Sequence, residues 1–138
     1  MKVLVSACIL GKNCKYNGKN NFNSKVVEFL KDKEVVEICP ELLAGLPTPR
    51  PSAELVNGVV MSIDGDNVDK QYRLGIDLAL KKIQNKDIDL VILQSRSPTC
   101  GVKQIYDGSF TGQLIKGQGL FAQALILEGY KVMDADEI

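Results

Sequence analysis

The stretch from Asp89 to Gly101, DLVILQSRSPTCG, joins a short apolar run to a loop that contains a cysteine. The run DLVIL, residues 89–93, has the length and aliphatic content of a strand that is buried on both faces of a sheet. The serines, proline and glycine that follow it are typical of a loop. We therefore expect a buried strand that ends before Cys100, with this thiol held in the loop beyond the strand.

Three further runs have the same character: KVLVSA (Lys2–Ala7), EVVEI (Glu34–Ile38) and YKVMD (Tyr130–Asp134). Helical patterns alternate with these runs over Lys25–Asp32, Asn67–Asn85 and Gly119–Gly129. Asn23 or Ser24 is expected to cap the first helix. This alternation predicts an α/β fold with a mostly parallel, Rossmann-like layered sheet and helices on both faces. The 138 residues fit a single domain, residues 1–138.

Two segments between these elements are less regular. Val59–Ser62 follows the pair Asn57-Gly58, so it is interpreted as a short strand or as part of a hairpin. The proline-rich segment 44–54 is interpreted as a stiff, ordered loop. Within that loop, Arg50 has prolines on both sides, and its guanidinium is expected to pair with Glu54 rather than with a ligand anion.

The composition excludes several classes of protein. Basic and acidic residues balance at 17 each, so no overall charge attracts the chain to a nucleic acid or a membrane. The absence of histidine excludes Ser-His and Cys-His nucleophile systems and His-ligated zinc enzymes. The N-terminal apolar run is interrupted by polar residues too early for a signal peptide or a membrane span, and we expect a cytoplasmic protein.

Three of the four cysteines lie beyond the carboxyl ends of predicted strands. Cys8 comes after the first strand, Cys39 after EVVEI, and Cys100 after DLVIL. The carboxyl ends of parallel strands lie at one edge of a sheet, where ligands bind in open α/β folds. The three thiols are therefore expected to converge.

Converging thiolates without histidine favour a thiophilic centre, either an iron–sulfur cluster or zinc. Cys14 leaves the ligand number open. If Cys14 is a ligand, the site is closed and structural, and if it is not, one metal position stays free for a substrate. Buried thiols that act only as small hydrophobic side chains are the alternative to a metal site.

Two polar residues next to these cysteines are candidates for chemistry. Glu41, in CPELLAG, is either an ordinary acid in the first turn of a helix or a carboxylate that faces the metal as a general acid or base. Ser97 precedes Cys100 and either caps a turn or donates a hydrogen bond to a substrate.

The motifs SACILGKNCKYNG, CPELLAGLPTPRPSAEL, SRSPTCG, IYDGSFTG and GQG occur in this order, and they span Val5 to about Tyr130. In this respect the chain resembles the DUF523 family, whose characterised members include a thiouracil desulfidase. The resemblance implies an α/β domain that holds a [4Fe-4S] cluster on three cysteines and leaves one iron open.

Carried over motif by motif, the resemblance implies that Cys8, Cys39 and Cys100 are the cluster ligands. It implies that Glu41 is the acid/base residue and that Ser97 positions the substrate. The implied reaction is hydrolytic cleavage of the C–S bond of 2- or 4-thiouracil, which yields uracil and sulfide without net redox change.

Three departures from the family pattern bear on substrate preference, namely Thr99, Asn17 and Ala44. Two alternative functions stay open. In one, the cysteines close a metal site that only staples the loops of a binding domain, and in the other the protein handles sulfur on a carrier or on thiolated tRNA. A small thiopyrimidine is the expected partner, and tRNA is disfavoured because the chain is small and carries no net charge.

Overall fold

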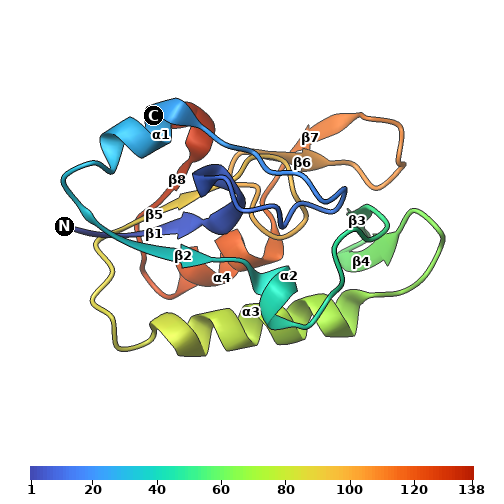
Figure 1. Cartoon of the computed structure of the whole chain (residues 1–138). Helices are drawn as coiled ribbons and strands as arrows, with labels where there is room; N and C mark the ends of the chain where they lie inside the picture. Colours follow the sequence, from blue (N-terminus) through green and yellow to red (C-terminus); the bar gives the residue numbers. More distant parts are fainter.

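A computed structural model describes the whole chain, residues 1–138, and a four-stranded sheet lies at its centre. The strands are β1 (Lys2–Ser6), β2 (Glu34–Ile38), β5 (Leu90–Leu93) and β8 (Val132–Asp134), in the order β2-β1-β5-β8 (Figure 1). Each neighbouring pair is parallel. The four predicted strands are therefore present, and the prediction of a mostly parallel sheet is confirmed.

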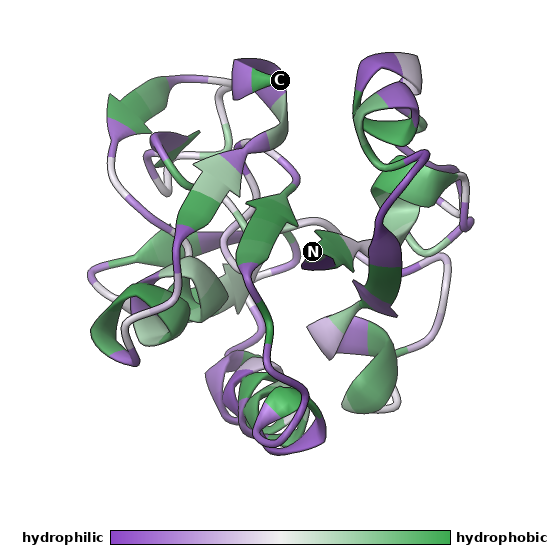
Figure 2. Ribbon diagram, turned by 90° about the vertical axis from the view of Figure 1, so that its left-hand side faces the viewer, coloured by the Kyte–Doolittle hydropathy of each residue, from purple (hydrophilic) through white to green (hydrophobic).

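Helices cover both faces of this sheet, as predicted. The helices α3 (Asp69–Ile83) and α4 (Leu120–Leu127) pack on one face, and α1 (Ser24–Phe29) packs on the other with the 3-10 helices η1 (Ala7–Leu10) and η2 (Ala135–Glu137). Along β5, Val91 and Leu93 join the first core, whereas Leu90 and Ile92 join the second. Figure 2 looks along the strands and shows α3 end-on below the sheet. A central strand that is buried on both faces explains why β5 is apolar throughout.

Local signals in the sequence set the helix ends. Of the two predicted capping residues, Asn23 is the one used, because its side-chain oxygen accepts a hydrogen bond of 3.1 Å from the backbone N–H of Val26. Gly129 follows α4 with a φ of 89°, the left-handed conformation that commonly ends a helix. Pro40 begins the short helix α2 (Pro40–Leu43), where its fixed φ suits the first helical turn.

Two antiparallel hairpins lie beyond the carboxyl ends of the sheet strands, on the right in Figure 1. The first consists of β3 (Ala53–Val56) and β4 (Val59–Ser62), joined by Asn57-Gly58 with φ values of 51° and 80°. Two positive φ values are what a type I′ hairpin turn requires, so the sequence predicted the turn correctly. It was wrong to place Ala53 and Glu54 in the preceding loop, since both belong to β3.

The second hairpin, β6 (Gln104–Tyr106) and β7 (Leu114–Lys116), is absent from the sequence prediction. Its strands have three residues each, which is too few for an alternating pattern to identify them. No helix of the protein has the length and apolar character needed to cross a membrane.

The order of the sheet strands defines where a ligand is expected. The strand β1 has β2 on one side and β5 on the other, so the order of the strands reverses direction between β1 and β5. In open α/β sheets, ligands bind outside the carboxyl ends of the strands at such a point. The helix α2 and both hairpins surround this edge (Figure 1).

Candidate functional site

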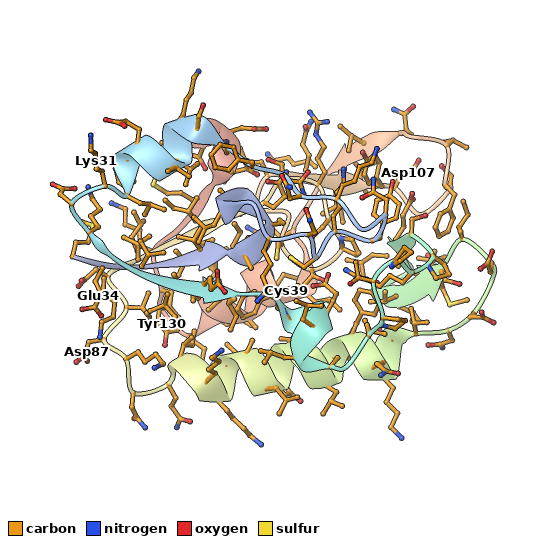
Figure 3. All side chains as sticks on the ribbon, viewed as in Figure 1. Lys31, Glu34, Cys39, Asp87, Asp107 and Tyr130 are labelled. Carbon is orange, nitrogen blue, oxygen red and sulfur yellow. The ribbon has the colours of Figure 1, made fainter.

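The cysteines that follow β1, β2 and β5 line one cavity of about 430 Å³ at this edge of the sheet. Cys8 lies in η1, Cys39 is the residue that caps α2, and Cys100 lies in the loop after β5. Cys14 lines the same cavity, and none of the four cysteines forms a disulfide. Figure 3 shows Cys39 near the centre of the molecule, where β2 ends. The structure thus brings together every cysteine that the sequence analysis named.

Close backbone packing holds the Cys100 loop in place. Ser97 Oγ accepts hydrogen bonds from the backbone N–H groups of Thr99 (3.2 Å) and Cys100 (2.6 Å). Gly119, which caps α4, lies so near this loop that an added Cβ would be 2.4 Å from the carbonyl carbon of Thr99. Only glycine allows such an approach, so Gly119 serves packing against the cysteine loop.

The environments of the thiols differ. A hydrogen bond with Cys14 is the main cause that lowers the pKa of Cys8 to about 7, with a smaller contribution from the Asn21 amide and an opposing one from burial. A hydrogen bond to Cys39, followed by the one to Cys8, raises the pKa of Cys14 well above its ordinary value. Burial, followed by the nearby Glu41 carboxylate, raises the pKa of Cys100. Of these three thiols, Cys8 is therefore the one that most readily becomes a thiolate, the form that binds metals.

Glu41 connects two of the cysteine loops. Its Oε1 accepts a hydrogen bond of 2.9 Å from the Thr99 hydroxyl, and its Oε2 lies 3.6 Å from Cys39 Sγ. The residue is in the first turn of α2, and it also lines the cavity beside the cysteines. Its carboxylate is held within the cavity by a hydrogen bond from a neutral hydroxyl group.

The predicted ion pair between Arg50 and Glu54 is wrong. Arg50 Nη2 donates to the carbonyl of Cys14 at 3.0 Å, and its Nη1 donates to Thr48 Oγ1 at 3.1 Å. Glu54 instead accepts hydrogen bonds from backbone N–H groups in the loop of the β6–β7 hairpin. Each charged group bonds mainly to backbone groups, which the sequence does not reveal, and Arg50 Nε has no hydrogen-bond partner.

The donor set is made of sulfur. No group of three His, Cys, Asp or Glu side chains has the geometry to hold a single metal ion. The ligands of an iron–sulfur cluster bind different iron atoms, so they lie around the cluster rather than around one point. Thiols on three separate loops around one cavity fit that arrangement, as does the hydrogen bond of 3.5 Å from Asn21 Nδ2 to Cys8 Sγ.

A sequence model of the family described as 2-thiouracil desulfurase matches residues 3–137. The chain belongs to the 2-thiouracil desulfurase family. Among its relatives is "Uncharacterized protein YbbK" of Bacillus subtilis (strain 168), which is 34% identical over an alignment of 146 residues. The alignment covers 99% of this chain and 97% of that protein.

A solved structure of the same family has nearly the same fold. It is a [4Fe-4S]-dependent thiouracil desulfidase, TudS (DUF523Vcz), with a TM-score of 0.92 and 34% sequence identity. The match covers 99% of this chain and 92% of that one. The resemblance to the DUF523 family and the predicted fold class are therefore confirmed.

Part of the cavity wall is aromatic, which was not predicted from the sequence. Tyr16, Tyr72, Tyr106 and Phe110 line the cavity together with the cysteines. They come from three separate segments, and two of them belong to the hairpin that was not predicted. The motif IYDGSFTG contains Tyr106 and Phe110, and it was the one available signal for them.

Proposed function

We propose that this protein is a desulfidase that converts a thiolated pyrimidine such as 2-thiouracil or 4-thiouracil into the oxo-pyrimidine and sulfide. The observation that carries the proposal is the position of Glu41 beside cysteines from three strand ends in one cavity. Membership of the 2-thiouracil desulfurase family and 34% identity to a [4Fe-4S]-dependent thiouracil desulfidase support it.

Cys8, Cys39 and Cys100 are proposed to hold a [4Fe-4S] cluster, with Cys14 as a neighbour of the site rather than a ligand. When bound, such a cluster would supply a Lewis-acidic iron without a protein ligand, which suits a soft thiocarbonyl sulfur. In the overall reaction, water supplies the oxygen of the new carbonyl and the sulfur leaves as sulfide. No electrons are gained or lost, so no reductant or oxidant is needed.

Glu41 is proposed as the general base for this water. Its Oε1 is occupied by the Thr99 hydroxyl, and its Oε2 has no donor other than the Cys39 thiol at 3.6 Å. Once that thiol has lost its proton to bind metal, Oε2 is the acceptor that remains within the cavity. A carboxylate placed in this way accepts a proton from water and releases it to the departing sulfide.

Ser97 is proposed to orient the substrate. Its Oγ accepts two backbone hydrogen bonds, which occupy the lone pairs of the hydroxyl. The proton of the hydroxyl is then the part that remains to donate. We expect the Ser97 hydroxyl to donate to an acceptor atom of the pyrimidine.

The test uses anaerobically reconstituted protein with 2-thiouracil, 4-thiouracil and thiolated tRNA as separate substrates. We expect about four irons per chain and conversion of a free thiouracil into uracil and sulfide, measured by chromatography and sulfide assay. Glu41→Gln keeps an oxygen for Thr99 but is a poor base, so it should retain its iron and lose roughly 100-fold or more in turnover.

Three results would contradict the proposal. A colourless protein with one zinc per chain would favour the metal staple. Turnover of thiolated tRNA without turnover of the free bases would favour the tRNA alternative. Full activity of Glu41→Gln would remove Glu41 as the base.

A further inference from the structure

The cavity beside the cysteines has an aromatic wall that the proposed chemistry does not use. The chain has four tyrosines, four phenylalanines and no tryptophan, and half of these aromatic residues line this one cavity. They are Tyr16, Tyr72, Tyr106 and Phe110. A volume of about 430 Å³ is within the range of small-molecule sites.

Phe110 stands out among the four because its backbone is in the left-handed region, with a φ of 59°. Bulky residues rarely adopt this conformation, and they do so only where the surrounding structure enforces it. Such strained residues concentrate at sites that clamp a ligand. Phe110 lies in the loop between β6 and β7, which sequence pattern alone would describe as a glycine-rich turn.

A buried carboxylate on the other hairpin holds this loop. Glu54 of β3 is 8% exposed, and its Oε1 accepts hydrogen bonds from the N–H of Gly108 (3.0 Å) and the N–H of Phe110 (3.2 Å). No ion pair includes Glu54. At Gly108 the two hairpins are so close that an added Cβ would lie 2.6 Å from the carbonyl oxygen of Leu55.

From these contacts we propose that Phe110 stacks on the ring of the substrate and that Glu54 is the residue that positions Phe110. The inference rests on the proposed function and deepens it, because it identifies the substrate class as flat heteroaromatic thiocarbonyl compounds. An aromatic side chain stacks on any such ring, whatever the position of its sulfur. Both 2- and 4-thiouracil are therefore accepted, whereas an aliphatic thioamide such as thioacetamide gains nothing from Phe110.

The experiment measures ring binding separately from chemistry. Binding of uracil to the cluster-loaded protein is followed by anaerobic calorimetry, and kcat and KM are measured with 2-thiouracil and 4-thiouracil. Phe110→Ala is expected to weaken uracil binding and to raise KM by roughly 10-fold or more, the size of a lost base–aromatic stack, with kcat and iron content unchanged. Phe22→Ala is the matched control, because Phe22 is 58% exposed and does not line the cavity.

Two further substitutions at Phe110 keep the test decisive if Phe110→Ala does not fold. Phe110→Tyr retains the ring and should bind uracil as the wild type does. Phe110→Leu retains an apolar side chain without the ring and should bind it about as weakly as Phe110→Ala.

Variants of Glu54 test the positioning role. Glu54→Ala removes the acceptor of both backbone hydrogen bonds and should reproduce the rise in KM at unchanged kcat. Glu54→Gln keeps an acceptor oxygen and should restore the wild-type KM, since backbone N–H groups and not a cation are its partners.

The outcomes separate the two proposals. If the wild type converts thiouracil and Phe110→Ala keeps the wild-type KM and uracil affinity, or Phe22→Ala loses as much, the inference is overturned and the proposed function stands. If the wild type neither binds uracil nor converts a thiouracil, both are overturned.

Discussion

Replacing Gly75 by alanine is expected to move α2, which carries the proposed base Glu41, while leaving α3 helical. Gly75 lies on the buried side of α3, where α2 packs against it. A Cβ at this position would be 2.1 Å from the carbonyl oxygen of Pro40 and 3.0 Å from Ala44 Cβ. Because the oxygen belongs to rigid backbone, α2 must retreat by about 1 Å or more.

The cost to stability is expected to be small. Overpacking of this kind costs about 1–3 kcal/mol, whereas alanine in place of glycine within a helix returns about 1 kcal/mol. The net loss is therefore about 0–2 kcal/mol, and thermal unfolding followed by circular dichroism should show a folded protein.

The effect on the site should be much larger. Pro40 lies between Cys39 and Glu41, so displacement of α2 shifts a proposed cluster ligand and the proposed base together. A misplacement of about 1 Å can reduce turnover by roughly 100-fold. We expect this loss in thiouracil turnover, together with less iron per chain after reconstitution. Asp77→Ala, on the exposed side of the same helix, is the matched control. A Gly75→Ala protein with wild-type iron and turnover would refute the reasoning that this contact places Cys39 and Glu41.

The other predictions concern the cysteines. Cys39→Ala should fold but lose its iron and visible absorption, and a brown, active variant would remove Cys39 from the ligand set. Cys14→Ser should retain its iron, and loss of iron would instead indicate ligation by four cysteines. In the cluster-free protein, alkylation of Cys8 by iodoacetamide should rise with pH around a midpoint of about 7, because its pKa is lowered and the thiolate is the reactive form, while Cys100 stays unreactive. A midpoint near the ordinary pKa of 9.0 would contradict the contact with Cys14. Since the folded state releases the Cys8 proton at lower pH than the unfolded chain does, this thiol stabilises the cluster-free protein as pH rises from about 7 to 9. The raised pKa values of Cys14 and Cys100 oppose this stabilisation above pH 9, where the unfolded chain ionises first.

The parts of the fold that were predicted correctly depend on local chemistry. The strand β5 is apolar because both of its faces are buried, and Asn57-Gly58 forms a turn because both residues accept a positive φ. The β6–β7 hairpin was missed because its strands are too short for an alternating pattern. The Arg50–Glu54 pair was wrong because nearness in sequence does not show which backbone groups a charged side chain will meet.

By itself, the sequence determined the parallel sheet, since buried strands are recognised by their apolar composition. It also determined the convergence of the cysteines, because parallel strands end at a common edge of the sheet. Only the tertiary structure decided how the cavity is completed. The Glu54 carboxylate accepts a hydrogen bond from the N–H of Phe110, 56 positions away in the sequence. Gly75 contacts the backbone of Pro40 because α3 packs against α2. Such contacts depend on how separate segments pack in three dimensions, which no local pattern in the chain encodes.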